Sequence, residues 1–302
     1  MSEETTDSGA PRFSLVAICR DGAGYVVRCL AAIAQQTFDL SRVEVVFVDD
    51  GSSDFSGDIA EKYGEELPRF KLVRTGAKDG SGCGGARNAG LAAATGEYVW
   101  HIDVDDWITP DALTLIDGAL SKAEKAYGKP ADVCVFPYRI DRRPGSRHKG
   151  GLVKPPATSV RDGVGGAVAA WAKVIRRELA VELPVGQMAQ DAAWHFAQWD
   201  RFERFASVGG DKPLYVYDRT NQTATSNTQE WTVVNPRTLE QLAFGDEAAK
   251  LGLKDRFFSD AIRALADMYD VRHRLRKPWV RAAWAARFRS QYASIMTGRF
   301  TH

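Results

Sequence analysis

The stretch of residues 82–107, GCGGARNAGLAAATGEYVWHIDVDDW, constrains the fold more than any other part of the chain. A glycine-rich turn leads into a helical pattern at 86–94, and a Thr-Gly turn then precedes a buried-strand run at 98–102. The strand run stops at three acids, Asp103, Asp105 and Asp106. Because Asp is depleted inside strands, this cluster belongs at the carboxyl end of a strand, where open α/β sheets bind ligands.

The chemistry of the three acids suggests a metal. Carboxylates within four residues repel one another unless a cation lies among them, and Mg²⁺ and Mn²⁺ prefer oxygen ligands. The pattern therefore predicts a metal–diphosphate site. The alternative is an acidic turn that is simply solvated.

Composition narrows the class of protein. The chain has 302 residues, 44% of them hydrophobic and 26% charged, with a formal net charge of +1, which is typical of a globular protein and not of a general polyanion binder. Its four cysteines show no metal-binding spacing, and we expect reduced thiols in a cytoplasmic protein. No apolar run of 18 residues and no secretory leader are recognisable in the sequence, so we expect no membrane-spanning helix.

The order of periodic segments predicts an α/β fold. Apolar runs that are typical of buried strands alternate with helical patterns along the first 110 residues; the strands are expected at 13–19, 43–48, 70–74 and 98–102, and the helices at 24–36, 56–67 and 86–94. This alternation indicates an α/β fold with an open sheet flanked by helices. Further on, we expect helices at 110–127 and 163–177 and strands at 133–138, 205–208 and 213–217.

A second pair of acids, Asp49 and Asp50, follows the strand at 43–48. Two carboxylates at a strand end can accept from a base N–H and a ribose hydroxyl. The usual alternative is helix capping, but both acids come too early to cap the helix that begins near Ser56, a role that suits Asp54 better.

The turn Gly22-Ala23-Gly24 after the first strand supports a different function. It begins a G-x-G-x-x-G dinucleotide fingerprint, although the third position holds Val27 where close helix–strand packing requires Gly or Ala. An NAD(P)-dependent oxidoreductase is therefore an alternative.

The segments VDDGSSD at 48–54 and GGARNAGLAAATGEYVWHIDVDD at 84–106 resemble the two signature segments of glycosyltransferase family 2. That family has a GT-A fold, so the resemblance implies a Rossmann-like open mixed sheet flanked by helices. The resemblance covers about residues 13–120. It implies that Asp50, beside Asp49, meets a uracil base, and that Arg87 lies near the phosphates. It further implies that the D-x-D-D segment contacts the ribose and the Mn²⁺ or Mg²⁺ ion of the donor, with Asp103 and Asp105 as donor ligands and Asp105 and Asp106 as metal ligands.

The first strand departs from the family pattern. Members usually end it in a P-x-Y-N-like segment whose aromatic lies near the base, whereas this chain has Cys19-Arg20-Asp21. A planar guanidinium can stack on a base, so Arg20 is a candidate for that contact.

The second half supplies the candidate base. Residues 184–200, PVGQMAQDAAWHFAQWD, resemble a family segment in which Asp191 maps to the general base of an inverting transfer. A mere N-cap at a helix start is the alternative for Asp191. The resemblance implies a nucleotide-diphosphate sugar as donor, expected to be a UDP-sugar, and an acceptor such as a polysaccharide, a lipid-linked glycan or a hydroxylated DNA base. A non-catalytic nucleotide-sugar-binding module is the remaining alternative.

We expect four parts along the chain: a disordered tail at 1–12, a nucleotide-sugar-binding half at 13–125, an acceptor-binding half at 126–230 and a helical extension at 231–302. Residues 271–302 hold eight Lys and Arg and no acid, interleaved with aromatic residues at helical spacing. Such a basic amphipathic helix can lie on an anionic membrane, contact a nucleic acid or pack on its own core. The inner face of a membrane is therefore an alternative location for the protein.

Overall fold

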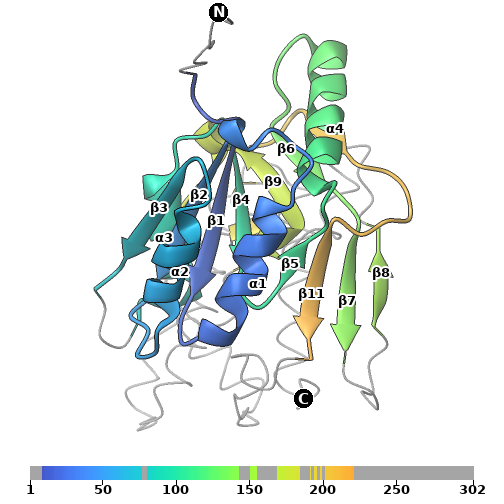
Figure 1. Cartoon of the computed structure of the whole chain (residues 1–302). Helices are drawn as coiled ribbons and strands as arrows, with labels where there is room; N and C mark the ends of the chain where they lie inside the picture. The colour runs from blue at the N-terminus through green and yellow to red at the C-terminus, as the bar shows by residue number, and fades with distance from the viewer. Residues whose placement is uncertain are drawn as a thin grey trace, which may run out of the picture.

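A sheet of seven strands carries the fold (Figure 1), in the order β10-β6-β9-β4-β1-β2-β3. The computed structural model describes residues 9–76, 80–142, 150–154, 169–183, 191, 194–195, 198 and 201–220. The strands of this sheet are β1 (Phe13–Cys19), β2 (Val43–Asp49), β3 (Phe70–Arg74), β4 (Tyr98–Asp103), β6 (Val133–Val135), β9 (Lys173–Arg176) and β10 (Phe205–Ser207).

The centre of this sheet is buried on both faces, which explains the continuous apolar runs of its strands. On one face, alternate residues of β1 pack with α1 (Ala23–Ala34), α2 (Ser56–Gly64) and α4 (Ala112–Tyr127). On the other face, Val16 and Val48 pack with α3 (Gly82–Ala93). A Cβ on Gly90 of α3 would lie 2.2 Å from Val16, so the glycine permits the close approach of this helix.

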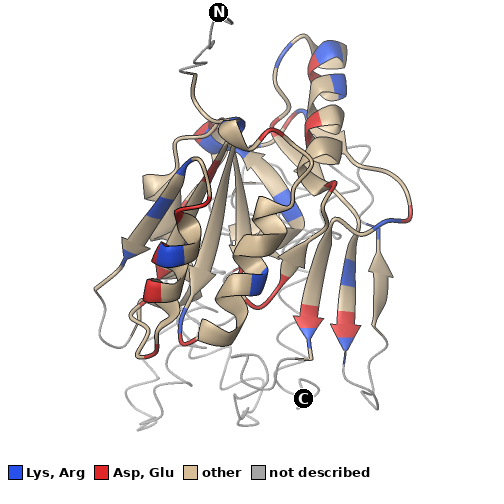
Figure 2. Ribbon diagram, in the orientation of Figure 1, with Lys and Arg blue, Asp and Glu red and all other residues tan. Residues whose placement is uncertain are grey.

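A second sheet lies beside the first, in the order β5-β11-β7-β8. Its strands are β5 (Trp107–Ile108), β7 (Tyr138–Arg142), β8 (Gly151–Val153) and β11 (Tyr215–Arg219). Because β5 directly follows the acidic turn and pairs with β11, residues 215–219 lie alongside that turn. Charged residues lie where β11 and β7 end (Figure 2), and there Asp218 pairs in register with Asp141.

The predicted open mixed α/β sheet flanked by helices is confirmed, and two of its strands, at 13–19 and 70–74, have the predicted bounds. The segment at 133–138 was predicted as one strand, but it divides between β6 and β7 in different sheets. The prediction of a helix at 163–177 was wrong for its final part, because Val174 and Ile175 lie in β9. This strand is hydrogen-bonded to β4 on one side and to β6 on the other. These β-branched side chains suit a strand buried between two neighbours.

Several predictions lie outside the described residues, notably the helical extension at 231–302, its basic helix at 271–302 and most of the tail at 1–12. Strands from both predicted halves, 13–125 and 126–230, share each of the two sheets. Within the part of the chain that the structure describes, no helix is both long enough and apolar enough to span a membrane.

Glu44 on β2 joins four segments and allows a prediction on stability. Its buried carboxylate accepts from Ser14 Oγ (2.6 Å), Lys71 Nζ (2.5 Å) and both the N–H and the hydroxyl of Thr95 (2.8 and 2.9 Å). Burial acts to raise the pKa of Glu44, but the hydrogen bonds outweigh it and hold the pKa below its ordinary value of 4.5.

We expect Glu44→Gln to lower the free energy of unfolding by about 1–3 kcal/mol at pH 7, because an ionised acceptor is lost. A depressed native pKa stabilises the fold above the ordinary pKa, and this contribution disappears as pH falls through the native pKa. The gap between wild type and variant in urea unfolding should therefore shrink from pH 7 to pH 3.5. An equal gap at both pH values would contradict this reading.

Candidate active site

The acids predicted to bind a ligand meet at one edge of the large sheet. In the strand register, Cys19 of β1 lies opposite Asp49 of β2, and Ile18 lies opposite Asp103 of β4. The two acidic segments therefore flank the end of β1 at the carboxyl ends of parallel strands. The structure thus brings together the two groups of acids that the sequence placed at strand ends.

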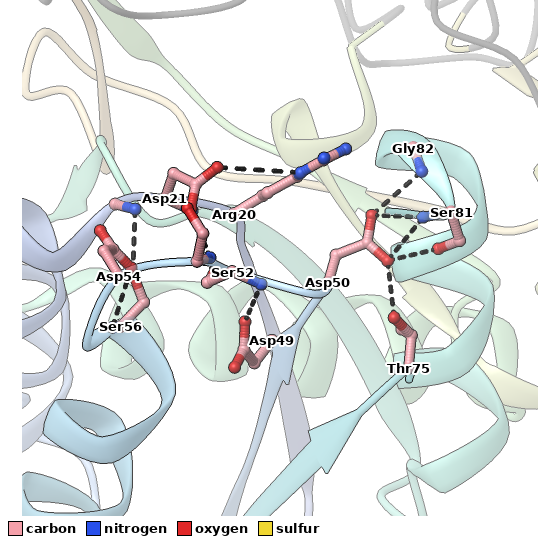
Figure 3. A network of polar contacts seen from close by, with 12 residues as sticks. Arg20, Asp21, Asp49, Asp50, Ser52, Asp54, Ser56, Thr75, Ser81 and Gly82 are labelled. Atoms are coloured by element: carbon pink, nitrogen blue, oxygen red, sulfur yellow. Dashed lines mark hydrogen bonds and ion pairs between the residues drawn. The ribbon is translucent and has the colours of Figure 1, made fainter. Parts of the chain in front are cut away.

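Asp50 lies at this edge, but its carboxylate is occupied (Figure 3). It accepts from the backbone N–H groups of Ser81 (2.8 Å) and Gly82 (3.0 Å) and from the hydroxyls of Ser81 (2.6 Å) and Thr75 (2.9 Å). Asp50 therefore caps the start of α3 from a distant part of the sequence. A base N–H would have to compete with these donors for the predicted contact.

Asp49 supports the turn that follows β2. It is buried, and its Oδ1 accepts from the backbone N–H of Ser52 (3.0 Å). Its Oδ2 would lie 2.4 Å from a Cβ on Gly57, so that position of α2 has no room for a side chain. Asp49 is thus turned towards α2, and the structure gives it a part in shaping the loop that carries Asp50.

The glycine turn at 22–24 is closed by side chains of the neighbouring loop. The N–H of Gly22 donates to Ser56 Oγ (2.9 Å), and the N–H of Ala23 donates to Asp54 Oδ2 (3.0 Å). A dinucleotide pyrophosphate would need the N–H groups at this helix start. Their occupation by the chain itself argues against the NAD(P) alternative.

Arg20 lies above Asp50 in the view of Figure 3. Its Nε is 3.9 Å from Asp21, and its Nη1 would lie 2.3 Å from a Cβ on Gly80. The guanidinium therefore reaches from the end of β1 towards the start of α3. This position suits the predicted stacking on a base, which remains a prediction.

Arg87 connects two acids that lie far apart in the sequence. It is buried on α3, and its Nη2 donates to Asp103 Oδ1 (2.6 Å) while its Nη1 lies 3.5 Å from Asp191 Oδ1. The other oxygen of Asp191 accepts from the N–H of Ala170 (3.3 Å). Burial raises the pKa of Asp103 to about 6, although Arg87 acts in the opposite direction. The predicted donor ligand and the predicted base thus share one guanidinium.

Asp106, predicted as a metal ligand, has contacts that favour a structural role. Its side chain is fully buried, Tyr215 Oη donates to one oxygen (2.6 Å) and the N–H of Asp218 donates to the other (2.7 Å). Burial, reinforced by Asp103 and Asp105, raises the pKa of Asp106 well above its usual value. Both carboxyl oxygens are engaged by β11, so Asp106 fixes the acidic turn against that strand, and its role as a metal ligand stays a prediction.

Asp105 is the better candidate for the metal. It is partly exposed, and its backbone carbonyl accepts from Arg28, which also pairs with Asp218 (3.2 Å) and lies 4.5 Å over the ring of Trp107. Mg²⁺ and Mn²⁺ in nucleotide sites are typically held by one or two carboxylates together with substrate phosphates. Asp103 and Asp105 match that donor set, and no group of three or more His, Cys, Asp or Glu side chains in the described ranges could hold an ion alone.

Three residues of this region were missed by the sequence reasoning: Arg28, Lys173 and Tyr215. Tyr215 and Arg28 act on the acidic turn from β11 and α1, and no local pattern signals such long-range contacts. Lys173 lay in a predicted helix. Recognition of β9 as a buried strand would have marked this lysine as unusual.

Comparison with known proteins gives a family match and distant structural neighbours. The model of the family described as Glycosyl transferase family 2 matches residues 14–178, more than half of the chain. The putative glycosyltransferase EpsH of Bacillus subtilis is 41% identical over 101 residues, which is 33% of this chain and only 28% of the relative. The chain thus aligns with about a quarter of that protein's length.

Two solved structures show the same fold at low sequence identity. Staphylococcus aureus TarS 1–349, in complex with UDP-GlcNAc, has a TM-score of 0.61 and 20% identity over 95% of this chain and 92% of that chain. The mannosyltransferase PcManGT of Pyrobaculum calidifontis, in complex with GDP-Man and Mn²⁺, has a TM-score of 0.50 and 18% identity over 96% of this chain and 80% of that chain. The expected GT-A-type fold is confirmed by these neighbours.

Proposed function

Because the chain belongs to glycosyl transferase family 2, we propose that it transfers a sugar from a nucleotide-diphosphate sugar to an acceptor hydroxyl, with inversion at the anomeric carbon. The observation that carries this proposal is the placement of Arg87 between Asp103 and Asp191 at the carboxyl ends of the strands. In such a transfer, the groups that bind the donor and the base act on the same anomeric carbon from opposite faces. Asp103 and Asp191 are near enough for this, because both pair with Arg87.

The donor would lie across the end of β1. In this proposal, Arg20 stacks on the base beside Asp50, Asp103 binds the ribose, and Asp105 with Asp103 holds Mn²⁺ or Mg²⁺. Such an ion would supply positive charge against the negative charge that grows on the leaving diphosphate. The complex of TarS with UDP-GlcNAc favours a UDP-sugar, and that of PcManGT with GDP-Man and Mn²⁺ makes GDP-sugars the second choice.

Asp191 would act as the general base. In an inverting transfer, one carboxylate removes the proton of the acceptor hydroxyl while that oxygen attacks the anomeric carbon opposite the diphosphate. The ion pair with Arg87 and the hydrogen bond from Ala170 fix both oxygens of Asp191. The base therefore has a set orientation before any acceptor arrives.

For the acceptor, we propose a glycan hydroxyl, on a polysaccharide or a lipid-linked sugar. The non-catalytic alternative is weakened because both the acid cluster and Asp191 are in place. The prediction of contact with DNA or with a membrane was based on residues 271–302, which are not among the described residues.

Release of UDP tests the function without knowledge of the acceptor. The purified chain with Mn²⁺ should release nucleotide slowly from UDP-GlcNAc, UDP-glucose or GDP-mannose by transfer to water. Release from none of these donors, together with no nucleotide binding, would reject the proposal.

Two neighbouring aspartates separate metal binding from stability. We expect Asp105→Ala to lower metal-dependent UDP affinity at least tenfold (about 1.4 kcal/mol) in calorimetry, with a change in unfolding free energy of about 0.5 kcal/mol or less. Asp106→Ala should instead cost about 1–3 kcal/mol of stability, because it leaves the Tyr215 hydroxyl and the Asp218 N–H unpaired. An Asp105 variant that keeps the metal dependence of the wild type would show that the metal ligand lies elsewhere.

A further inference from the structure

Lys173 on β9 is buried to an unusual degree for a lysine, at 1% exposure. Its Nζ lies 4.7 Å from the ring centroid of Trp194, a favourable cation–π distance. The indole N–H of Trp194 donates to the carbonyl of Val181 (2.7 Å), and its ring meets the edge of His101 at 5.5 Å. The side chain of Lys173 is therefore held in place against Trp194.

One peptide group links Lys173 to Asp191. The Nζ of Lys173 donates to the carbonyl of Ala169 (2.9 Å), and the N–H on the other side of that same peptide, on Ala170, donates to Asp191 Oδ2 (3.3 Å). A cation on the carbonyl polarises the peptide and strengthens its N–H as a donor, since linked hydrogen bonds reinforce one another. Lys173 thus acts on the carboxylate through a peptide that cannot rotate without breaking both contacts.

The charges around Lys173 make its own ionisation sensitive. Burial lowers the pKa of Lys173 to about 7. The positive charge of Arg87 also acts to lower this pKa, whereas the negative charge of Asp191 acts to raise it. The neighbouring His101 stays neutral, because burial, together with Arg87 and Lys173, keeps its pKa well below the usual value. The lysine therefore changes charge close to neutral pH, next to the candidate base.

We propose that Lys173 is a positioning residue that orients Asp191, through the Ala169–Ala170 peptide, for removal of the acceptor proton. This inference rests on the proposed role of Asp191 as base. A lysine that merely filled the core would support the fold without any specific effect on the chemical step.

The first test separates turnover from binding. We compare Lys173→Met with Lys71→Met, which removes the lysine that pairs with Glu44 on the remote edge of the sheet. The readouts are Mn²⁺-dependent UDP release from UDP-GlcNAc and calorimetric UDP affinity. Lys173→Met should lower kcat about tenfold or more, a part of the usual contribution of a general base, with donor KM and UDP affinity within about twofold. Lys71→Met should lower stability and leave kcat nearly unchanged.

The second test measures the pH dependence of the rate and repeats the Lys173 substitution in the Asp191→Asn variant. The wild-type rate should change slope near pH 7, whereas Lys173→Arg, whose side chain stays charged, should lose that inflection. In an Asp191→Asn background, Lys173→Met should have no further effect on the residual rate. An unchanged kcat in Lys173→Met, or an equal loss in both backgrounds, would overturn the proposal even if the enzyme transfers sugar as expected.

The third test does not need turnover. In an NMR titration of labelled lysine, Lys173 should titrate near pH 7 in the wild type and at lower pH in Asp191→Asn, because the carboxylate that favours its charged form is gone. An unchanged midpoint would mean that the two groups are not linked. Failure of the proposed function is seen separately, as absence of nucleotide release by the wild type.

Discussion

Replacing Asp191 by Asn should reduce sugar transfer by about 10²- to 10⁴-fold, the usual contribution of a general base. The amide cannot take up the acceptor proton, yet it can still occupy the place between Arg87 and the N–H of Ala170. Metal-dependent UDP binding should therefore stay within about twofold of wild type in calorimetry. The loss should appear in kcat and not in donor KM.

Asp58→Asn provides the control, because this aspartate is exposed on α2 and pairs only with the exposed Arg74 among its described contacts. Its rate should equal that of the wild type. Transfer that survives in Asp191→Asn would show that another group removes the proton. Loss of UDP binding together with the rate would show instead that Asp191 holds the donor.

Replacing Arg87 by Met should lower the free energy of unfolding by about 3–5 kcal/mol, the usual cost of breaking a buried ion pair by removing one partner. The side chain is 3% exposed, and its loss removes the cation that pairs with both Asp103 and Asp191. Donor binding should also fail, since Asp103 would lose its orientation. Urea unfolding and UDP calorimetry measure the two effects.

Arg74→Met is the matched control for Arg87. Arg74 also pairs with two acids, Asp58 and Glu61, but all three side chains are exposed. Exposed pairs of this kind contribute about 0–1 kcal/mol, so the variant should be nearly as stable as wild type. Equal losses of unfolding free energy in Arg74→Met and Arg87→Met would mean that burial does not explain the contribution of Arg87 to stability.

Local pattern was sufficient for the strands that carry the first half of the fold. The run at β1 is apolar and bounded by turn residues, β3 mixes apolar and basic residues, and the predicted bounds of both strands agree with the structure. The start of α3 was placed four residues late, because the group that caps it is Asp50, 31 residues before Ser81 in the chain. A cap from so far away leaves no signal at the helix start.

Pairing between distant segments decided the rest. Val174 and Ile175 fit a helix or a buried strand equally well on sequence, and only the position between β4 and β6 selects the strand. Likewise, the sequence identified the acids but could not distinguish Asp105 from Asp106. The difference lies in the contacts of Asp106 with β11, a strand about 110 residues further along the chain.

The most direct test of the central claim is calorimetric titration of the purified chain with UDP, with and without Mn²⁺, and with NAD as comparison. A metal-dependent nucleotide-sugar site between Arg20, Asp50 and Asp105 predicts clear UDP binding in Mn²⁺, much weaker binding without it, and no binding of NAD. NAD binding that needs no metal, with no binding of UDP or GDP, would contradict the account and place the ligand at the glycine turn of residues 22–24.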